Sequence, residues 1–191
     1  YTSYTLLKIE DVKAIRAYLF SLPAVNQPNR DNSMMFPFNQ RWGLIAWKKA
    51  NFTPGRMKVD NNKDQAWNRG AYLVEALGHC GECHTPRNIT MGLKQGERYS
   101  GASLEGWTVF NITSDKVAGI GNWSKQEIVQ YLRSGRVAFK AQAAGPMAEV
   151  IENSTRHLSD GDLDAMAHYI ATLEAKNPND ETHSRSELGT I

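Results

Sequence analysis

The sequence predicts an all-α fold, and three observations support this prediction. Residues 68–77 and 163–173 carry apolar side chains at the spacing of amphipathic helices. Helix-opening serines stand at positions 124 and 159. Residues 85–121, which lie between the helical segments, are rich in glycine and show little alternation of period two, so we expect mostly loop there. Helices therefore have to supply the hydrophobic core.

Each expected helix has a signal of its own. Residues 68–77 form one broad apolar face, which consists of Ala71, Leu73, Val74 and Leu77. The next helix begins at a capping box, Ser124 followed three residues later by Glu127, and Gly135 ends it. A third helix begins at Ser159, and its apolar stripe consists of Leu163, Met166, Ala167, Ile170 and Leu173.

Composition and charge exclude several classes of protein. The 191 residues have a mean hydropathy of −0.51, and no apolar run approaches the roughly 20 residues of a membrane span. No signal peptide is visible, but this excludes little, because Tyr1 is not expected to be a true start. The net charge of +2 gives no reason to invoke nucleic acid. Residues 1–66 carry ten basic and five acidic side chains (+5), whereas residues 67–175 carry ten and twelve (−2), which predicts a junction near residue 66.

The chemistry of the chain concentrates in residues 79–86, HCGECHTP. They contain the only two cysteines, Cys80 and Cys83, and His84 follows at once. A zinc site needs about four ligands, and the other histidines form no second pair. A thioredoxin-like motif follows a strand, but here a helix precedes it, and a disulfide would close a very small loop. Covalent attachment of a c-type haem remains, against a dithiol/disulfide couple without haem.

A haem iron held by His84 needs a sixth ligand, and methionine is the usual one in electron transfer. Met91 is too near in sequence, and Met166 is expected in the core. Met147 follows His84 by 63 residues (147 − 84), which lets the chain return on the opposite face, and Gly-Pro before it suits a tight loop. The rival ligands are His157 and His168, and an open sixth position would instead make a haem-based sensor or catalyst.

The order helix, CxxCH, long loop, helix, Met loop and terminal helix resembles a class I cytochrome c domain over residues 67–175. In that family the first and last helices cross closely, and Gly70 and Tyr169 occupy the matching positions. Candidates to hydrogen-bond or pair with the haem propionates are Trp107, Asn111, Trp123, Tyr99 and Arg87, and simple loop packing or a surface charge is the alternative for each.

An internal repeat precedes that domain. Residues 7–22 match residues 158–173 at a constant offset of 151 (158 − 7), and the identical pairs are Leu7/Leu158, Asp11/Asp162, Ala14/Ala165, Tyr18/Tyr169 and Leu22/Leu173. We therefore expect residues 1–22 to be the terminal helix of a truncated upstream cytochrome c domain. Residues 23–66 would then be a linker and residues 176–191 a polar tail.

The linker is rich in aromatic residues between Met34 and Phe52. Trp42, Ile45 and the pair Lys48-Lys49 fit a short amphipathic helix. Its rings either pack against the haem domains or contact a partner or a membrane surface.

Three stretches are similar to a narrower group, namely RGAYLVEALGHCGECHTPRN, NITSDKVAGIGNWSKQEIVQYLRSG and AQAAGPMAEVIENS. They resemble the multi-haem cytochrome c subunit of bacterial membrane-bound alcohol, gluconate and sorbitol dehydrogenases. The resemblance implies an electron-transfer subunit, not an enzyme by itself, that passes electrons from a catalytic subunit to ubiquinone on the periplasmic side of the inner membrane. It also implies haem c on Cys80 and Cys83, with His84 and Met147 as iron ligands.

Overall fold

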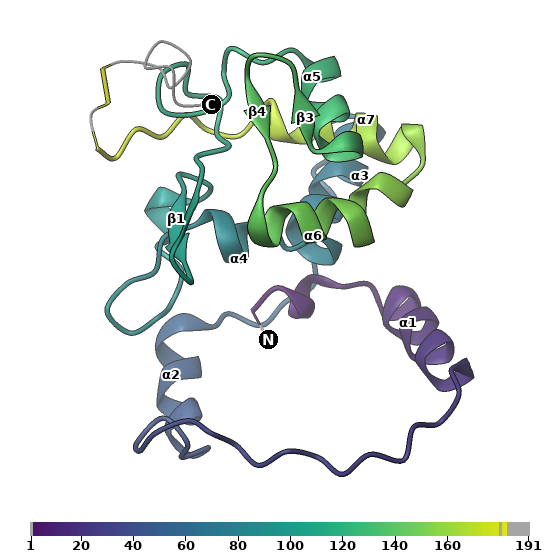
Figure 1. Cartoon of the computed structure of the whole chain (residues 1–191), viewed down its shortest axis with the longest axis vertical. Coiled ribbons are helices and arrows are strands. Elements are labelled where there is room, and N and C mark those ends of the chain that lie inside the picture. Colours follow the sequence, from purple (N-terminus) through teal and green to yellow (C-terminus); the bar gives the residue numbers. More distant parts are fainter. Residues whose placement is uncertain (1, 180, 183–191) are drawn as a thin grey trace. The chain divides into compact units, whose positions relative to one another are not determined.

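A computed structural model describes residues 2–179 and 181–182, and helices predominate in it (Figure 1). The chain divides into two compact units, Tyr1–Met57 and Lys58–Ile191, and each is described by itself. Within the described residues, no helix combines the length and the apolar character that a membrane crossing requires.

The first unit contains a 3₁₀ turn, η1 (Tyr4–Leu6), and two helices, α1 (Ile9–Ser21) and α2 (Gly43–Asn51). Its last residues run back beside its first: the Met57 amide donates to the Leu6 carbonyl (3.2 Å), and Arg56 donates to the Leu7 carbonyl (2.6 Å). Neither helix contains a buried residue. The expected short helix in the aromatic stretch is present as α2, whereas most of the segment between α1 and α2 has no regular structure.

The second unit contains the remaining elements. In chain order they are α3 (Gln65–Tyr72), the π-helical turn η2 (Leu73–Leu77), α4 (Gly81–His84), η3 (Gln95–Glu97), β1 (Ala102–Leu104), β2 (Trp107–Val109), α5 (Lys125–Ser134), β3 (Arg136–Val137), β4 (Ala141–Gln142), α6 (Gly145–Asn153), η4 (Thr155–His157) and α7 (Asp160–Ile170). The strands form two separate antiparallel pairs, β1 with β2 and β3 with β4.

The predicted helix signals are confirmed in this unit. Ser124 and Glu127 form the capping box of α5, and Gly135 ends that helix in the left-handed conformation (φ 73°). The Ser159 side chain caps α7 by accepting from the Asp162 amide. The prediction of a mainly helical fold is therefore confirmed, and the two short hairpins β1–β2 and β3–β4 are additions to it.

The β1–β2 hairpin is a departure from the mostly irregular structure expected of residues 85–121. Ala102 pairs with Val109, and Leu104 pairs with Trp107. The two residues between the strands, Glu105 and Gly106, both have positive φ (50° and 82°), as a tight hairpin turn requires. Three residues per strand are too few to show alternation in the sequence, so the pattern could not reveal them.

The core of this unit forms where α3 and α7 cross. A Cβ atom on Gly70 would lie 1.9 Å from the Ala165 carbonyl oxygen, so only glycine permits this approach. One turn away, the Trp67 and Tyr169 rings meet edge to face, with centroids 5.0 Å apart. The close crossing is thus made by Gly70 against the α7 backbone, and the Tyr169 ring packs on Trp67 beside it.

Candidate haem-attachment site

The two cysteines lie on one helical turn that follows the first helix of the unit after a break at Gly78 and His79, where His79 has a positive φ of 39°. After the π-helical turn η2, the Cys80 amide donates to the Val74 carbonyl (3.0 Å), and the His84 amide donates to the Cys80 carbonyl (3.0 Å). Cys80 is half-buried and Cys83 is exposed, and both are free thiols. Cys80 is the N-cap residue of α4 and has helical backbone angles, so it lies on the same face as Cys83, three residues later.

The electrostatic surroundings do not favour a dithiol redox couple. Burial, with a smaller contribution from the Glu75 charge, raises the pKa of the Cys80 thiol to about 12. Burial and the neighbouring Glu82 also raise the pKa of Cys83. Reactive redox cysteines have lowered pKa values, because the thiolate is the nucleophile. Both thiols are therefore neutral at physiological pH.

His84 is held in one tautomer by a backbone carbonyl. Its Nδ1 lies 2.7 Å from the Phe110 oxygen, and burial lowers the pKa of the ring. A neutral imidazole that donates from Nδ1 keeps the lone pair of Nε2 free for a metal. Phe110 could not be identified from the sequence, because any residue can supply a carbonyl.

Met147 lies in the first turn of α6 rather than in the tight loop expected for it. Pro146 stands at the start of this helix, where its fixed φ suits helical geometry and its missing N–H costs nothing. Gly145 has a positive φ of 50°, and a Cβ there would lie 2.5 Å from the Trp107 ring. Met147 itself is half-buried.

The short segment 107–110 therefore contacts both the His84 ring and the backbone that precedes Met147. Trp107 covers the backbone two residues before Met147, and the Phe110 carbonyl orients His84. Three apolar side chains next to these ligand segments are about half exposed, Trp107 at 47%, Phe110 at 52% and Val150 at 46%. Such an apolar surface suits a flat macrocycle, and the soft sulfur and imidazole donors suit its iron. The residues present therefore fit haem c.

The rival ligands are engaged elsewhere. His157 Nε2 lies 2.9 Å from the Glu152 carbonyl, and His168 Nε2 lies 3.1 Å from Asp64 Oδ2. Met166 is buried in the core, as expected. Throughout the described ranges, no three His, Cys, Asp or Glu side chains gather as a potential metal-binding group.

Asn111 and Arg87, two of the five residues proposed around the haem, have other partners in the structure. The Asn111 oxygen accepts from the Thr113 amide (2.8 Å), and its nitrogen donates to the Lys176 carbonyl (2.6 Å). Arg87 binds Glu82, between the two cysteines, at 2.9 Å. In these contacts Asn111 ties a loop to the C-terminal segment, and Arg87 braces the attachment turn; a role of either residue beside the haem stays a prediction.

The three aromatic candidates lie in different surroundings. Tyr99 is buried and packs on the attachment turn, since its hydroxyl would be 3.4 Å from a Cβ on Gly81. Trp123 stacks edge to face on Tyr131, with centroids 5.6 Å apart. Trp107 adjoins the Met147 segment as described above. The structure thus brings Tyr99 and Trp107 to the ligand-bearing segments and gives Trp123 a packing contact with α5.

A partly buried charge cluster beside the attachment turn was missed by sequence analysis. Glu75 in η2 binds Arg98 and accepts a hydrogen bond from the Tyr169 hydroxyl. The signal was available, because Glu75 stands between Val74 and Ala76 on a helix that is otherwise apolar there. Its partners lie 23 and 94 residues away, however, and no local pattern connects them.

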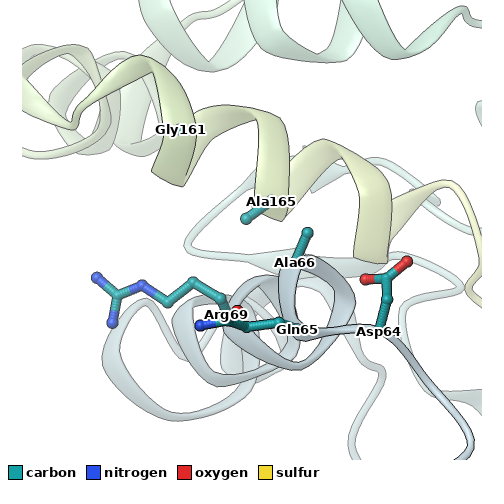
Figure 2. A pocket seen from close by; sticks show the side chains of 6 residues that line it. All are labelled: Asp64, Gln65, Ala66, Arg69, Gly161 and Ala165. Atoms are coloured by element: carbon teal, nitrogen blue, oxygen red, sulfur yellow. The ribbon is translucent and has the colours of Figure 1, made fainter.

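An open surface depression lies apart from these residues, at the crossing of α3 and α7 (Figure 2). Figure 2 shows Ala66 of α3 and Ala165 of α7 facing each other, with Asp64 and Arg69 at its edge. Arg69 binds Asp162 at 2.8 Å, and Asp64 binds His168. The depression contains none of the expected haem ligands, and small side chains at the helix crossing account for it.

Comparison with known proteins gives a consistent set of relatives. The chain is 41% identical to the fructose dehydrogenase cytochrome subunit of Gluconobacter japonicus over 189 residues, 98% of this chain and 39% of that protein. It is 38% identical to the gluconate 2-dehydrogenase cytochrome c subunit of Pantoea cypripedii, again over 98% of this chain but 44% of the relative. It is 40% identical to a dihaem cytochrome c of Cereibacter sphaeroides, with 92% and 58% covered. No protein-family profile matches the chain.

The chain thus spans between two fifths and three fifths of the length of these relatives. The matches agree with the CxxCH turn, the oriented histidine and the helical fold, which were established independently of them. The chain is a homologue, at 33–41% identity over most of its length, of the cytochrome c subunits of fructose, gluconate and alcohol (quinone) dehydrogenases.

Proposed function

We propose that this chain carries one haem c and transfers electrons within a dehydrogenase complex. The haem would be bound through thioethers to Cys80 and Cys83, with His84 and Met147 as axial ligands. The observation that carries this proposal is the His84 Nδ1 contact with the Phe110 carbonyl, which prepares Nε2 for iron directly beside two neutral thiols on one helical turn.

The protein residues have three tasks in this proposal. When bound, the haem supplies one-electron redox chemistry. His84 would bind the iron through its oriented ring, and Met147 would offer a thioether, a ligand that favours the reduced iron and raises the potential. Trp107, Phe110 and Val150 would pack against the macrocycle and limit the access of water. If both residues bound the iron, no substrate could reach it, and the chain would be a relay rather than an enzyme by itself.

The partners follow from the relatives. Their names pair a cytochrome subunit with fructose, gluconate or alcohol (quinone) dehydrogenase activity. By analogy, the chain would accept electrons from a catalytic subunit and pass them to ubiquinone or another respiratory acceptor. Covalent haem attachment is carried out outside the inner membrane, so the complex would work on its periplasmic face, associated with the membrane surface.

The aromatic stretch from Met34 to Phe52 is the surface that we propose for docking to the catalytic subunit. Its large apolar side chains are mostly exposed, for example Met35 at 80%, Phe36 at 78% and Trp42 at 71%. An apolar surface of this kind marks a protein contact, and a permanent contact needs no electrostatic steering. The near-neutral charge of residues 67–175 (−2) agrees with a docked relay rather than a diffusing carrier.

The haem proposal is tested by producing the chain in a bacterial periplasm that attaches c-type haem. We expect a mass one haem above the 21.4 kDa polypeptide and a ferrous spectrum that carbon monoxide barely changes. The variant C80A should lose the thioether at that position. An unmodified polypeptide mass would overturn the proposal, and strong carbon monoxide binding at neutral pH would favour the alternative, a sensor or catalyst with an open sixth position.

The docking surface is tested in the assembled complex. Replacing Trp42 and Trp47 by Ala should weaken the association of the cytochrome subunit with its catalytic subunit and leave the haem spectrum unchanged. Reduction of the wild-type subunit by the catalytic subunit should depend only weakly on ionic strength. A steep fall in that rate between low and physiological salt would indicate a freely diffusing carrier and contradict the proposal.

A further inference from the structure

Glu75 is a carboxylate on which three separate parts of the second unit meet. It projects from the π-helical turn η2, and only 14% of its side chain is exposed. Arg98 reaches it from the loop after η3, and the Tyr169 hydroxyl reaches it from α7. A partly buried carboxylate is costly unless it is paired and hydrogen-bonded, and both conditions are met here.

This cluster touches the attachment turn. A Cβ atom on Gly81, which lies between the two cysteines, would be 3.5 Å from Arg98 Nη2. The Glu75 charge also contributes to the raised pKa of the Cys80 thiol, so its field reaches the first attachment position. Tyr99, next to Arg98 in sequence, is buried against the same turn.

We infer that the Glu75–Arg98 pair is a charge-compensating element, in which each partner prevents the charge of the other from shifting the redox potential of the haem attached at Cys80 and Cys83. This inference rests on the proposed haem function. The oxidised iron carries one positive charge more than the reduced iron, so a negative neighbour favours oxidation and a positive neighbour favours reduction. In the intact pair the two effects largely cancel, and the loss of either partner leaves the other uncompensated.

The pair therefore predicts shifts of opposite sign from two substitutions of similar size. E75Q leaves the Arg98 charge uncompensated and should raise the ratio of reduced to oxidised protein at a fixed applied potential. R98Q leaves the Glu75 charge and should lower that ratio. The expected change is about four- to tenfold, which is the range for a unit charge acting over roughly 12–20 Å at an effective dielectric constant near 20.

The experiment is a spectroelectrochemical titration of the haem-loaded chain at about pH 8. Covalent haem is first verified by mass in every variant. The double variant E75Q/R98Q should return to within about twofold of the wild-type ratio, because both charges are absent. The control is D162N, which breaks the Arg69–Asp162 pair between α3 and α7, a pair more exposed than Glu75–Arg98, and which should leave the ratio unchanged.

The outcomes separate this inference from the haem proposal. A wild-type chain without covalent haem would refute the proposed function itself. Loaded variants that shift in the same direction, or not at all, would overturn only the charge-pair inference, because loosened packing has no reason to reverse sign. If R98Q does not retain haem, E75Q and R98K decide the question: E75Q has to favour reduction, and R98K, which keeps the charge, has to match the wild type.

Discussion

The crossing of α3 and α7 makes a quantitative prediction at Gly70. A Cβ added there would lie 1.9 Å from the Ala165 carbonyl oxygen, 2.5 Å from its carbon and 3.0 Å from the Tyr169 Cβ. Ordinary contacts begin near 3.4 Å, and the first two obstacles are backbone atoms that cannot rotate away. The variant G70A therefore has to force the two helices apart.

The free energy of unfolding should fall by about 2–4 kcal/mol. Overpacking of a core costs about 1–3 kcal/mol and more where backbone has to move. Separation of the helices also weakens the edge-to-face contact of Trp67 with Tyr169, and such contacts contribute about 0.5–1.5 kcal/mol. The higher helix propensity of alanine offsets at most about 1 kcal/mol of this loss in the free energy of unfolding.

The assay is thermal unfolding of the haem-loaded chain, followed by far-ultraviolet circular dichroism. With about 2–4 °C of midpoint shift per kcal/mol, G70A should unfold roughly 5–15 °C below the wild type. The matched control is G161A in α7, where an added Cβ has no neighbour within 4 Å and should be neutral or stabilising by up to about 1 kcal/mol. A G70A midpoint within a degree of the wild type would refute the close-crossing argument.

Three further predictions concern the ligand and two helices. The variant M147A should lose the weak sulfur-to-iron band in the far red and have a lower midpoint potential, and an unchanged spectrum would exclude this ligand. S124A removes the capping box of α5 and should cost about 1 kcal/mol, measured as a lower midpoint in denaturant unfolding; no change would show that water replaces the cap. In hydrogen exchange, the amides of α1 should exchange far faster than those of α7, because α1 has no buried residue and α7 has six; equal protection would reveal a partner that covers α1.

The sequence predicted those features that depend on neighbours in the chain. The caps at Ser124 and Ser159 and the CxxCH turn all lie within a few residues of the groups that they serve. The features that it did not reveal depend on distant segments or on backbone atoms. The contact of His84 with the Phe110 carbonyl involves a backbone atom, which no residue pattern identifies. The role of Glu75 depends on Arg98 and Tyr169, which are distant in sequence and contact it only in the folded chain. The position of Met147 was predicted as a loop because glycine and proline favour turns, but proline equally favours the first turn of a helix.

The internal repeat places matching apolar stripes in two helices that differ in burial. In α7, the backbone carbonyl of Ala165 lies against Gly70, and the Tyr169 ring meets the Trp67 ring edge to face. The corresponding residues of α1 are Ala14 and Tyr18, and Tyr18 is 65% exposed. A helix of 13 residues gains little stability from propensity alone, so an apolar stripe conserved between the two copies has a use only against another surface. We therefore propose that α1 is the terminal helix of a second cytochrome c unit, and that its natural partner is a helix that places a glycine opposite Ala14.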